Sequence, residues 1–216
     1  MKLLRWLTEL LYPPKCVFCR RLLRPEEQEL CAHCRTSLPE AEQCVKRGAY
    51  YSACISVYYY EEAVADSVRR FKFRGMRQYA ATYGRLIAMQ LLRRRVEFDV
   101  LSWVPVSDKR RRERGYDQTL LIAQSAAAEL GVPCVQTLKK VLNNPPQSLQ
   151  PDAAARRANV INAYRAVEPE RFCGKRVLLI DDVISTGATL SECSHTLRRA
   201  GAASVVGATL AAARLH

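Results

Sequence analysis

One stretch of the chain constrains its fold more than any other: an apolar run that leads straight into two adjacent carboxylates. In "VLLIDDVISTGATL" (177–190), Asp181 and Asp182 end the apolar run, and a segment rich in Ser, Thr and Gly follows. Charged groups at the end of a buried strand are costly to desolvate, so the two carboxylates are expected to have a functional role. The stretch therefore predicts a buried strand with a functional site at its carboxyl end.

The chain after residue 48 alternates between strand-like and helix-like patterns. Runs rich in β-branched, aromatic and apolar residues predict strands at 55–60, 98–106, 133–141, 176–183 and 204–213. Apolar residues at helical spacing predict helices before "RRFKFRG", around 83–95, at 120–130 and around 190–197. Strands that alternate with helices predict an α/β fold with a parallel sheet and crossover helices.

The segment after the acid pair predicts an anion pocket. In open parallel sheets, ligands bind beyond the carboxyl ends of the strands. Free N–H groups and the positive end of the helix dipole at 185–189 suit a phosphate, and Gly187 permits close approach. Asp181 and Asp182 suit sugar hydroxyls or a hydrated magnesium ion, so a sugar phosphate satisfies both halves. The alternative is a plain strand–turn–helix with two solvated acids; a nucleotide P-loop is excluded, because the sequence has no G-x4-G-K-[ST].

A second anion site is predicted in "WVPVSDKRRRERGYDQ" (103–118). It follows another strand and carries five basic residues within 109–114. Arg guanidinium groups match phosphate oxygens bidentately, so this segment suits a pyrophosphate. A basic surface loop that binds nucleic acid or nothing is the alternative.

The cysteines predict a metal site. Two C-x2-C pairs, Cys16/Cys19 and Cys31/Cys34, can each wrap a tight knuckle around one ion and together supply four thiolates. We expect a structural zinc ion there, with free structural cysteines as the alternative. Cys44 is a substitute ligand, and Cys54 a weaker one.

The net charge and the N-terminal segment limit the possible partners and the cellular compartment of the protein. The chain of 216 residues carries 34 Lys+Arg against 21 Asp+Glu, a net charge of +13. This surplus suits nucleic acid, an anionic membrane surface or a polyphosphate-bearing small molecule, or is a solvated basic surface. Leucines on one face of 1–11 predict a short amphipathic helix, not a secretion signal. No apolar run is long enough to span a bilayer, and nine cysteines without an export signal suit a reducing compartment, so a cytoplasmic protein is expected.

These motifs together resemble the ComF family of bacterial competence-associated proteins. "CVFC" and "CAHC" match its zinc finger, "FKFRG" a basic motif with Lys72 and Gly75, and "VPVSDKRRRERGYDQ" its Pro-Val-Pro…Arg-Gly-Phe-Asn-Gln region. "NNPPQSLQPDAAARRANVINAYR" matches its Pro-Pro-Gln stretch, and "VLLIDDVISTGATL" its phosphoribosyl loop. This chain departs from the pattern at Ser107 for Pro, Asp117 for Asn, and Tyr116 and Tyr164 for Phe.

The resemblance implies a zinc module at 1–48 and a type I phosphoribosyltransferase-like domain at 49–216, similar to amidophosphoribosyltransferases. It implies that phosphoribosyl pyrophosphate binds with magnesium, with Lys72 on the substrate side. The phosphoribosyl site would comprise Asp181, Asp182, Val183, Ser185, Thr186, Gly187, Ala188 and Thr189. The pyrophosphate loop would comprise Val106, Ser107, Arg110 and Arg114, and a flexible loop at 143–160 would carry Gln147 and Arg157.

Two functions are compatible with this reading. The first is a phosphoribosyltransferase linked to DNA uptake, whose acceptor no residue identifies. The second is a non-enzymatic competence factor that binds single-stranded DNA or a helicase partner and uses the pocket only as a ligand sensor. Direct strand binding has weak support from the sequence, because no aromatic stacking platform is interleaved with the basic residues.

Overall fold

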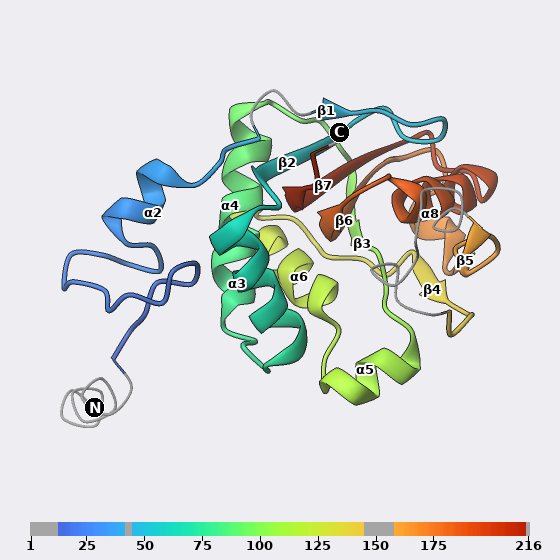
Figure 1. Ribbon diagram of the computed structural model, residues 1–216. Helices are drawn as coiled ribbons and strands as arrows, with labels where there is room; N and C mark the ends of the chain where they lie inside the picture. The colour runs from blue at the N-terminus through green and yellow to red at the C-terminus, as the bar shows by residue number, and fades with distance from the viewer. Residues whose placement is uncertain (1–12, 42–44, 145–157, 215–216) are drawn as a thin grey trace, which may run out of the picture.

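The computed structural model describes residues 13–41, 45–144 and 158–214. At their centre is one sheet with helices on both faces (Figure 1). The sheet has five strands in the order β1-β2-β7-β6-β3. They are β1 (Val45–Lys46), β2 (Cys54–Tyr59), β7 (Ser204–Ala212), β6 (Arg176–Ile184) and β3 (Val100–Trp103). The last four are parallel to one another, and β1 is antiparallel to β2. The predicted parallel sheet is confirmed, with a short antiparallel strand added at one edge.

Helices cover both faces of the sheet, which explains why β6 is apolar without interruption from Val177 to Ile180. Leu178 and Ile180 pack with α4 and α6, whereas Val177 and Leu179 pack with α8 on the other face. Alternate residues of a strand point to opposite faces, so both sets are buried. The helices are α2 (Ala32–Ser37), α3 (Glu62–Phe73), α4 (Tyr79–Arg93), α5 (Asp108–Arg114), α6 (Gln118–Leu130), the 3-10 turn η2 (Pro169–Arg171) and α8 (Ala188–Arg199).

The strand predicted at 133–141 is wrong as one continuous element. Cys134 forms only an isolated parallel bridge to Leu101, at the edge of the central sheet. Further along, β4 (Leu138–Lys140) pairs antiparallel with β5 (Tyr164–Ala166) in a separate two-stranded sheet. The chain therefore leaves the central sheet at about residue 136 and forms a small lobe beside α8 (Figure 1).

The cysteine-rich segment packs onto α3. The Ser67 hydroxyl donates a hydrogen bond to the Val17 carbonyl (2.6 Å), and Arg70 Nη2 donates to the carbonyls of Val17 (3.0 Å) and Phe18 (2.6 Å). The Phe18 ring is buried and lies edge-on to the Tyr58 ring of β2, with centroids 5.4 Å apart. The segment and the sheet therefore share one hydrophobic core.

The amphipathic helix predicted at 1–11 lies outside the described residues. Within 13–41, 45–144 and 158–214, no helix combines the length and the apolar character needed to cross a bilayer.

Candidate functional site

The acid pair lies at the carboxyl end of β6, as predicted, and its two side chains have different partners. Asp182 is buried, and its Oδ1 lies 2.8 Å from Lys72 Nζ at the end of α3. Gln118 Nε2, at the start of α6, donates to Asp182 Oδ2 at 3.4 Å. Asp181 Oδ1 accepts the Asp182 N–H at 2.8 Å. Burial, and then the neighbouring carboxylate of Asp182, raises the pKa of Asp181 to about 8.

The predicted phosphate loop follows the acids and leads into α8. Gly187 is the N-cap residue of α8 and has a left-handed φ of 78°. A Cβ atom there would lie 2.5 Å from the Tyr51 hydroxyl, so both the conformation and the close approach require glycine. A small cavity of about 60 Å³ is lined by Asp181 and by residues 183–190, with Thr209. The loop and Asp181 therefore border one concave site, at the positive end of a helix.

Lys46 holds this loop from the side of β1. Its Nζ donates to the Ser185 carbonyl (2.5 Å) and to the Ala213 carbonyl (2.8 Å), after β7. The lysine thus joins the start of the phosphate loop to the neighbouring strand. Lys46 was not predicted from the sequence, because the residues next to it in the chain form no recognisable motif.

Within 103–118, residues Asp108–Arg114 form helix α5, where a basic loop was expected. Ser107 is the N-cap of α5, its hydroxyl accepting the Arg110 N–H at 3.4 Å, and Gly115 ends the helix with a left-handed φ of 75°. Arg110 Nη2 donates to the Asn144 carbonyl at 3.2 Å. Burial, together with the charge of Arg114, lowers the pKa of Arg110. Arg110 is therefore a partly desolvated cation beside the site, which suits an anionic ligand.

Arg114, the other basic residue predicted for the pyrophosphate loop, has a different partner. Its guanidinium lies over the ring of Phe73, 5.1 Å from the centroid, and Phe73 is 69% exposed. Arg77 lies over the Tyr116 ring at 4.8 Å. One exposed aromatic ring, that of Phe73 with Arg114 over it, therefore lies at the end of α3, whereas Tyr116 is buried. The sequence analysis did not predict this exposed ring.

Asp117 and Gln118 fasten the turn before α6. Asp117 is the N-cap, with Oδ1 accepting the Leu120 N–H (3.0 Å) and Oδ2 accepting the Val106 N–H (3.3 Å). Asp117 therefore acts as a cap within the turn that carries Val106. Gln118 is buried against Asp182 and was not selected from the sequence; the "RGYDQ" motif that contains it was the available signal.

Three further titratable groups lie near Asp181: Lys140 and Tyr164 of the small lobe, and Cys193 of α8. Lys140 Nζ lies over the Tyr164 ring, 5.2 Å from its centroid. The Tyr164 hydroxyl and the Cys193 thiol are hydrogen-bonded to each other, and burial raises the pKa of each well above its ordinary value. Both groups are therefore neutral at physiological pH. Gln147 and Arg157, predicted for the flexible loop, lie outside the described residues.

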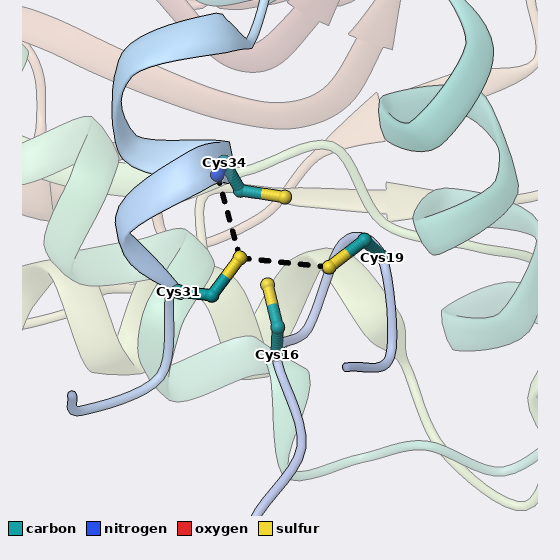
Figure 2. Close-up of side chains that lie close together, drawn as sticks. All are labelled: Cys16, Cys19, Cys31 and Cys34. Carbon is teal, nitrogen blue, oxygen red and sulfur yellow. Dashed lines mark hydrogen bonds between the residues drawn. The ribbon is translucent and has the colours of Figure 1, made fainter. Parts of the chain in front are cut away.

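The four predicted zinc ligands converge (Figure 2). The sulfur atoms of Cys16, Cys19, Cys31 and Cys34 all lie within 4.8 Å of one another, and the Cys19 and Cys31 sulfurs are 3.6 Å apart. Burial opposes the thiolate of Cys16, but surrounding N–H donors outweigh it and lower its pKa to about 7. Four thiol ligands without a fifth donor fit a structural zinc ion. Cys54 is buried in β2 beside Gly207 and Leu190 and is not part of this group, and Cys44 lies outside the described residues.

Comparison with known proteins gives two family matches. Residues 117–215 match the phosphoribosyl transferase domain family, and residues 7–57 match the double zinc ribbon domain family. Among curated proteins, competence protein F of Haemophilus influenzae is 29% identical over 210 residues, covering 87% of this chain and 92% of that protein. DNA utilization protein YhgH of Salmonella typhi is 30% identical over 203 residues, covering 88% and 86%. Competence protein ComFC of Bacillus subtilis is 26% identical over 222 residues, also covering 88% and 86%.

Among solved structures, the allosteric regulatory enzyme of purine biosynthesis aligns with a TM-score of 0.45 at 25% identity, over 65% of this chain. The glutamine phosphoribosylpyrophosphate amidotransferase of B. subtilis aligns with a TM-score of 0.43 at 28% identity, over 61% of this chain. This chain spans less than a third of either enzyme, 29% and 26% respectively.

The fold, the four-cysteine site and the family matches define a protein with a zinc ribbon and a phosphoribosyltransferase-type domain. Its identity to curated relatives extends over most of both chains. The chain belongs to the ComF family of competence and DNA utilization proteins.

Proposed function

We propose that this protein binds phosphoribosyl pyrophosphate with magnesium at the carboxyl end of β6 and serves DNA uptake or utilization as a phosphoribosyltransferase. The observation that carries the proposal is that Asp181 lines the same cavity as the start of α8. Carboxylates and helix N–H groups at one cavity complement the hydroxyls and the 5′-phosphate of a phosphorylated pentose. The names of the relatives support the link to DNA.

In this proposal the described residues divide into three groups. Asp181 and Asp182 hold the ribose hydroxyls, residues 185–189 hold the 5′-phosphate, and Val183 completes the phosphoribosyl site. Val106, Ser107, Arg110 and Arg114 face the pyrophosphate, with Lys72 beside the acids. Gln147 and Arg157, which lie outside the described residues, would act on the bound substrate. The zinc module at 1–48 would precede the transferase-like part at 49–216, and the protein would act in the cytoplasm.

The reaction would be a displacement at C1 of the ribose. The lone pair of an amine or base forms a bond to C1, the C1–O bond to pyrophosphate breaks, and its electrons leave with pyrophosphate; the nucleophile then loses a proton to water. Bound magnesium would neutralise charge on the pyrophosphate. The protein's own contribution is to position the sugar and to stabilise the leaving anion with Lys72 and Arg110.

Calorimetry with phosphoribosyl pyrophosphate and magnesium tests the binding step. We expect saturable heat with the wild-type protein, and at least tenfold weaker binding with Asp181→Asn/Asp182→Asn. Asp66→Asn is the matched control, because Asp66 is an exposed acid on α3 that pairs with Arg69. Equal heats in the wild type and the double variant, or none in either, would overturn the proposal.

A second candidate function is supported by the exposed Phe73 ring under Arg114. Base–aromatic stacking beside arginine is how single strands are bound without sequence preference. In this reading the protein binds single-stranded DNA or a helicase partner and uses the sugar-phosphate pocket as a sensor.

Two assays separate the candidates. Pyrophosphate release, screened across amines and bases, would be sustained for an enzyme and absent for a sensor. Fluorescence anisotropy with a labelled oligo-dT strand would show salt-dependent binding that weakens in Phe73→Ala for the second candidate. The control is Leu92→Ala, another exposed apolar residue, at 64%, which lies on α4.

A further inference from the structure

A buried amide beside the acid pair uses only half of its hydrogen-bonding capacity. Gln118, the first residue of α6, is buried, and its Nε2 donates to Asp182 Oδ2 at 3.4 Å. Its carbonyl oxygen Oε1 is buried without a hydrogen-bond partner in the part of the chain that the structure describes. Buried acceptors normally have partners, because an unpaired one keeps the full cost of its desolvation. The group that Gln118 lacks is therefore a hydrogen-bond donor.

We propose that Gln118 is a specificity-determining residue of the acid-pair site and accepts a hydrogen bond from a ribose hydroxyl. This inference rests on the proposed function and deepens it, because it states which sugar the site accepts. One of the two neighbouring hydroxyls of the sugar donates to Asp182, and the other donates to Gln118 Oε1. The site then requires the intact diol of ribose and rejects 2-deoxyribose, the sugar of DNA.

The partners of Asp182 explain why the missing donor belongs to a neutral group. Asp182 Oδ1 lies 2.8 Å from Lys72 Nζ, so one cation already balances this buried carboxylate. The amide of Gln118 carries no charge, and a second cation beside it would be a buried charge without a counter-ion. A hydroxyl supplies the proton that Oε1 needs and adds no charge to the pair.

The start of α6 holds the Gln118 amide at the carboxylate that a sugar would use. Asp117 caps the helix by accepting the Leu120 N–H at 3.0 Å, which fixes the turn that carries Gln118. The contact to Asp182 is longer than the usual range of about 2.7–3.2 Å for such hydrogen bonds. It is the only hydrogen bond of the Gln118 side chain among the described residues. The amide therefore turns toward a ligand on Asp182 at little cost.

A polar contact of this kind discriminates sharply between sugars. A site built to hydrogen-bond a hydroxyl rejects the analogue that lacks it, because the buried polar group of the protein is then left unpaired. The acid pair would accordingly take a ribose metabolite. Any contact with DNA would then belong to another surface, such as the one around the exposed Phe73 ring.

Calorimetry with ribose 5-phosphate and its 2-deoxy and 3-deoxy analogues tests the role of Gln118. The wild type should bind ribose 5-phosphate at least about tenfold more tightly than either analogue. Gln118→Met keeps the length of the side chain and removes the amide. In this variant the preference over one analogue should fall below about threefold, while the preference over the other remains. Gln124→Met, at an exposed glutamine of the same helix, should keep both preferences.

The outcomes separate this inference from the proposed function. If ribose 5-phosphate shows no saturable binding, both fail. If the wild type binds all three sugars equally, the inference fails and the proposed site stands. An equal loss of affinity for all three in Gln118→Met would also overturn the inference, because Gln118 would then only support the shape of the site. If Gln118→Met does not fold, Gln118→Asn, which draws the amide back by one methylene, replaces it with the same expected result.

Discussion

Lys72 Nζ lies 2.8 Å from Asp182 Oδ1, which joins two residues that are 110 positions apart in the chain. The Asp182 side chain is only 7% exposed and that of Lys72 21%, so the pair is largely removed from solvent. The lysine therefore balances one of the two adjacent acids before any ligand arrives. It also ties the end of α3 to the end of β6.

Replacing Lys72 tests how much of the fold depends on this pair. Lys72→Met should destabilise the protein by about 3 kcal/mol, because it leaves a buried carboxylate without its counter-charge. Urea unfolding measures the change. The control is Arg69→Met on the same helix, whose ion pair with Asp66 is more than half exposed and should contribute much less, because solvent screens it. Equal losses in the two variants would contradict a special role for the buried pair.

Asp181 predicts a pH dependence of stability. Its pKa is about 8 in the folded protein, above the ordinary value of about 3.9, so the folded state binds the proton more tightly. The resulting stability is present below about pH 4 and is lost as the pH rises through about 8. The free energy of unfolding should thus fall more steeply between pH 5 and pH 9 in the wild type than in Asp181→Asn. Parallel curves for the two proteins would show that Asp181 ionises as an ordinary acid.

The contacts of Lys46 predict that hydrogen bonds from β1 keep the phosphate loop in its binding conformation. Lys46→Met removes two charge-assisted hydrogen bonds and should weaken binding of phosphoribosyl pyrophosphate about tenfold, a change of about 1.4 kcal/mol. Lys175→Met is the matched control, since Lys175 Nζ donates to the Arg171 carbonyl at 2.9 Å on the exposed surface. Calorimetry compares the two; a wild-type affinity in Lys46→Met would show that the loop keeps its shape unaided.

Alanine substitutions at two glycines with the same backbone conformation distinguish backbone strain from steric crowding. Gly174 has a φ of 73° with no atom near the position of a Cβ, whereas Gly187 has a φ of 78° and would place a Cβ against Tyr51. Gly174→Ala should cost about 1 kcal/mol of unfolding free energy, and Gly187→Ala at least about 2 kcal/mol. Tyr51→Phe should restore part of the second loss only. The prediction is wrong if the two alanine variants unfold alike.

The cysteine cluster predicts one zinc ion per chain. Elemental analysis of protein purified under reducing conditions should find it, and Cys31→Ser should lose it together with much of the thermal stability. Cys173→Ser, an exposed cysteine outside the cluster, should keep the metal. A zinc content that does not change between these two variants would refute the site.

The parts of the fold that could be predicted from the sequence are those with local signals. The apolar run before Asp181, the helical stripe before Gly131 and the spacing of Cys16, Cys19, Cys31 and Cys34 each act within a few residues, and each is confirmed. The basic segment 109–114 was expected to be a loop. That prediction used its cluster of charges and not Ser107, which caps the start of a helix.

The parts that could not be predicted depend on distant partners. Lys46 reaches Ser185 across 139 positions, and the exposure of Phe73 depends on where α3 ends relative to α5. At 133–141 the β-propensity was read correctly for β4, but propensity alone does not tell which sheet a strand joins. Such contacts are set by tertiary packing, which one sequence does not display.

The hydrogen bonds from Ser67 and Arg70 to the Val17 and Phe18 carbonyls have a practical consequence. A fragment that begins after the ribbon would expose the hydrophobic surface that Phe18 covers. It would also lack the carbonyl groups that accept hydrogen bonds from Ser67 and Arg70 of α3. The same helix ends beside Lys72, so loss of the ribbon is expected to disturb the ion pair between Lys72 and Asp182.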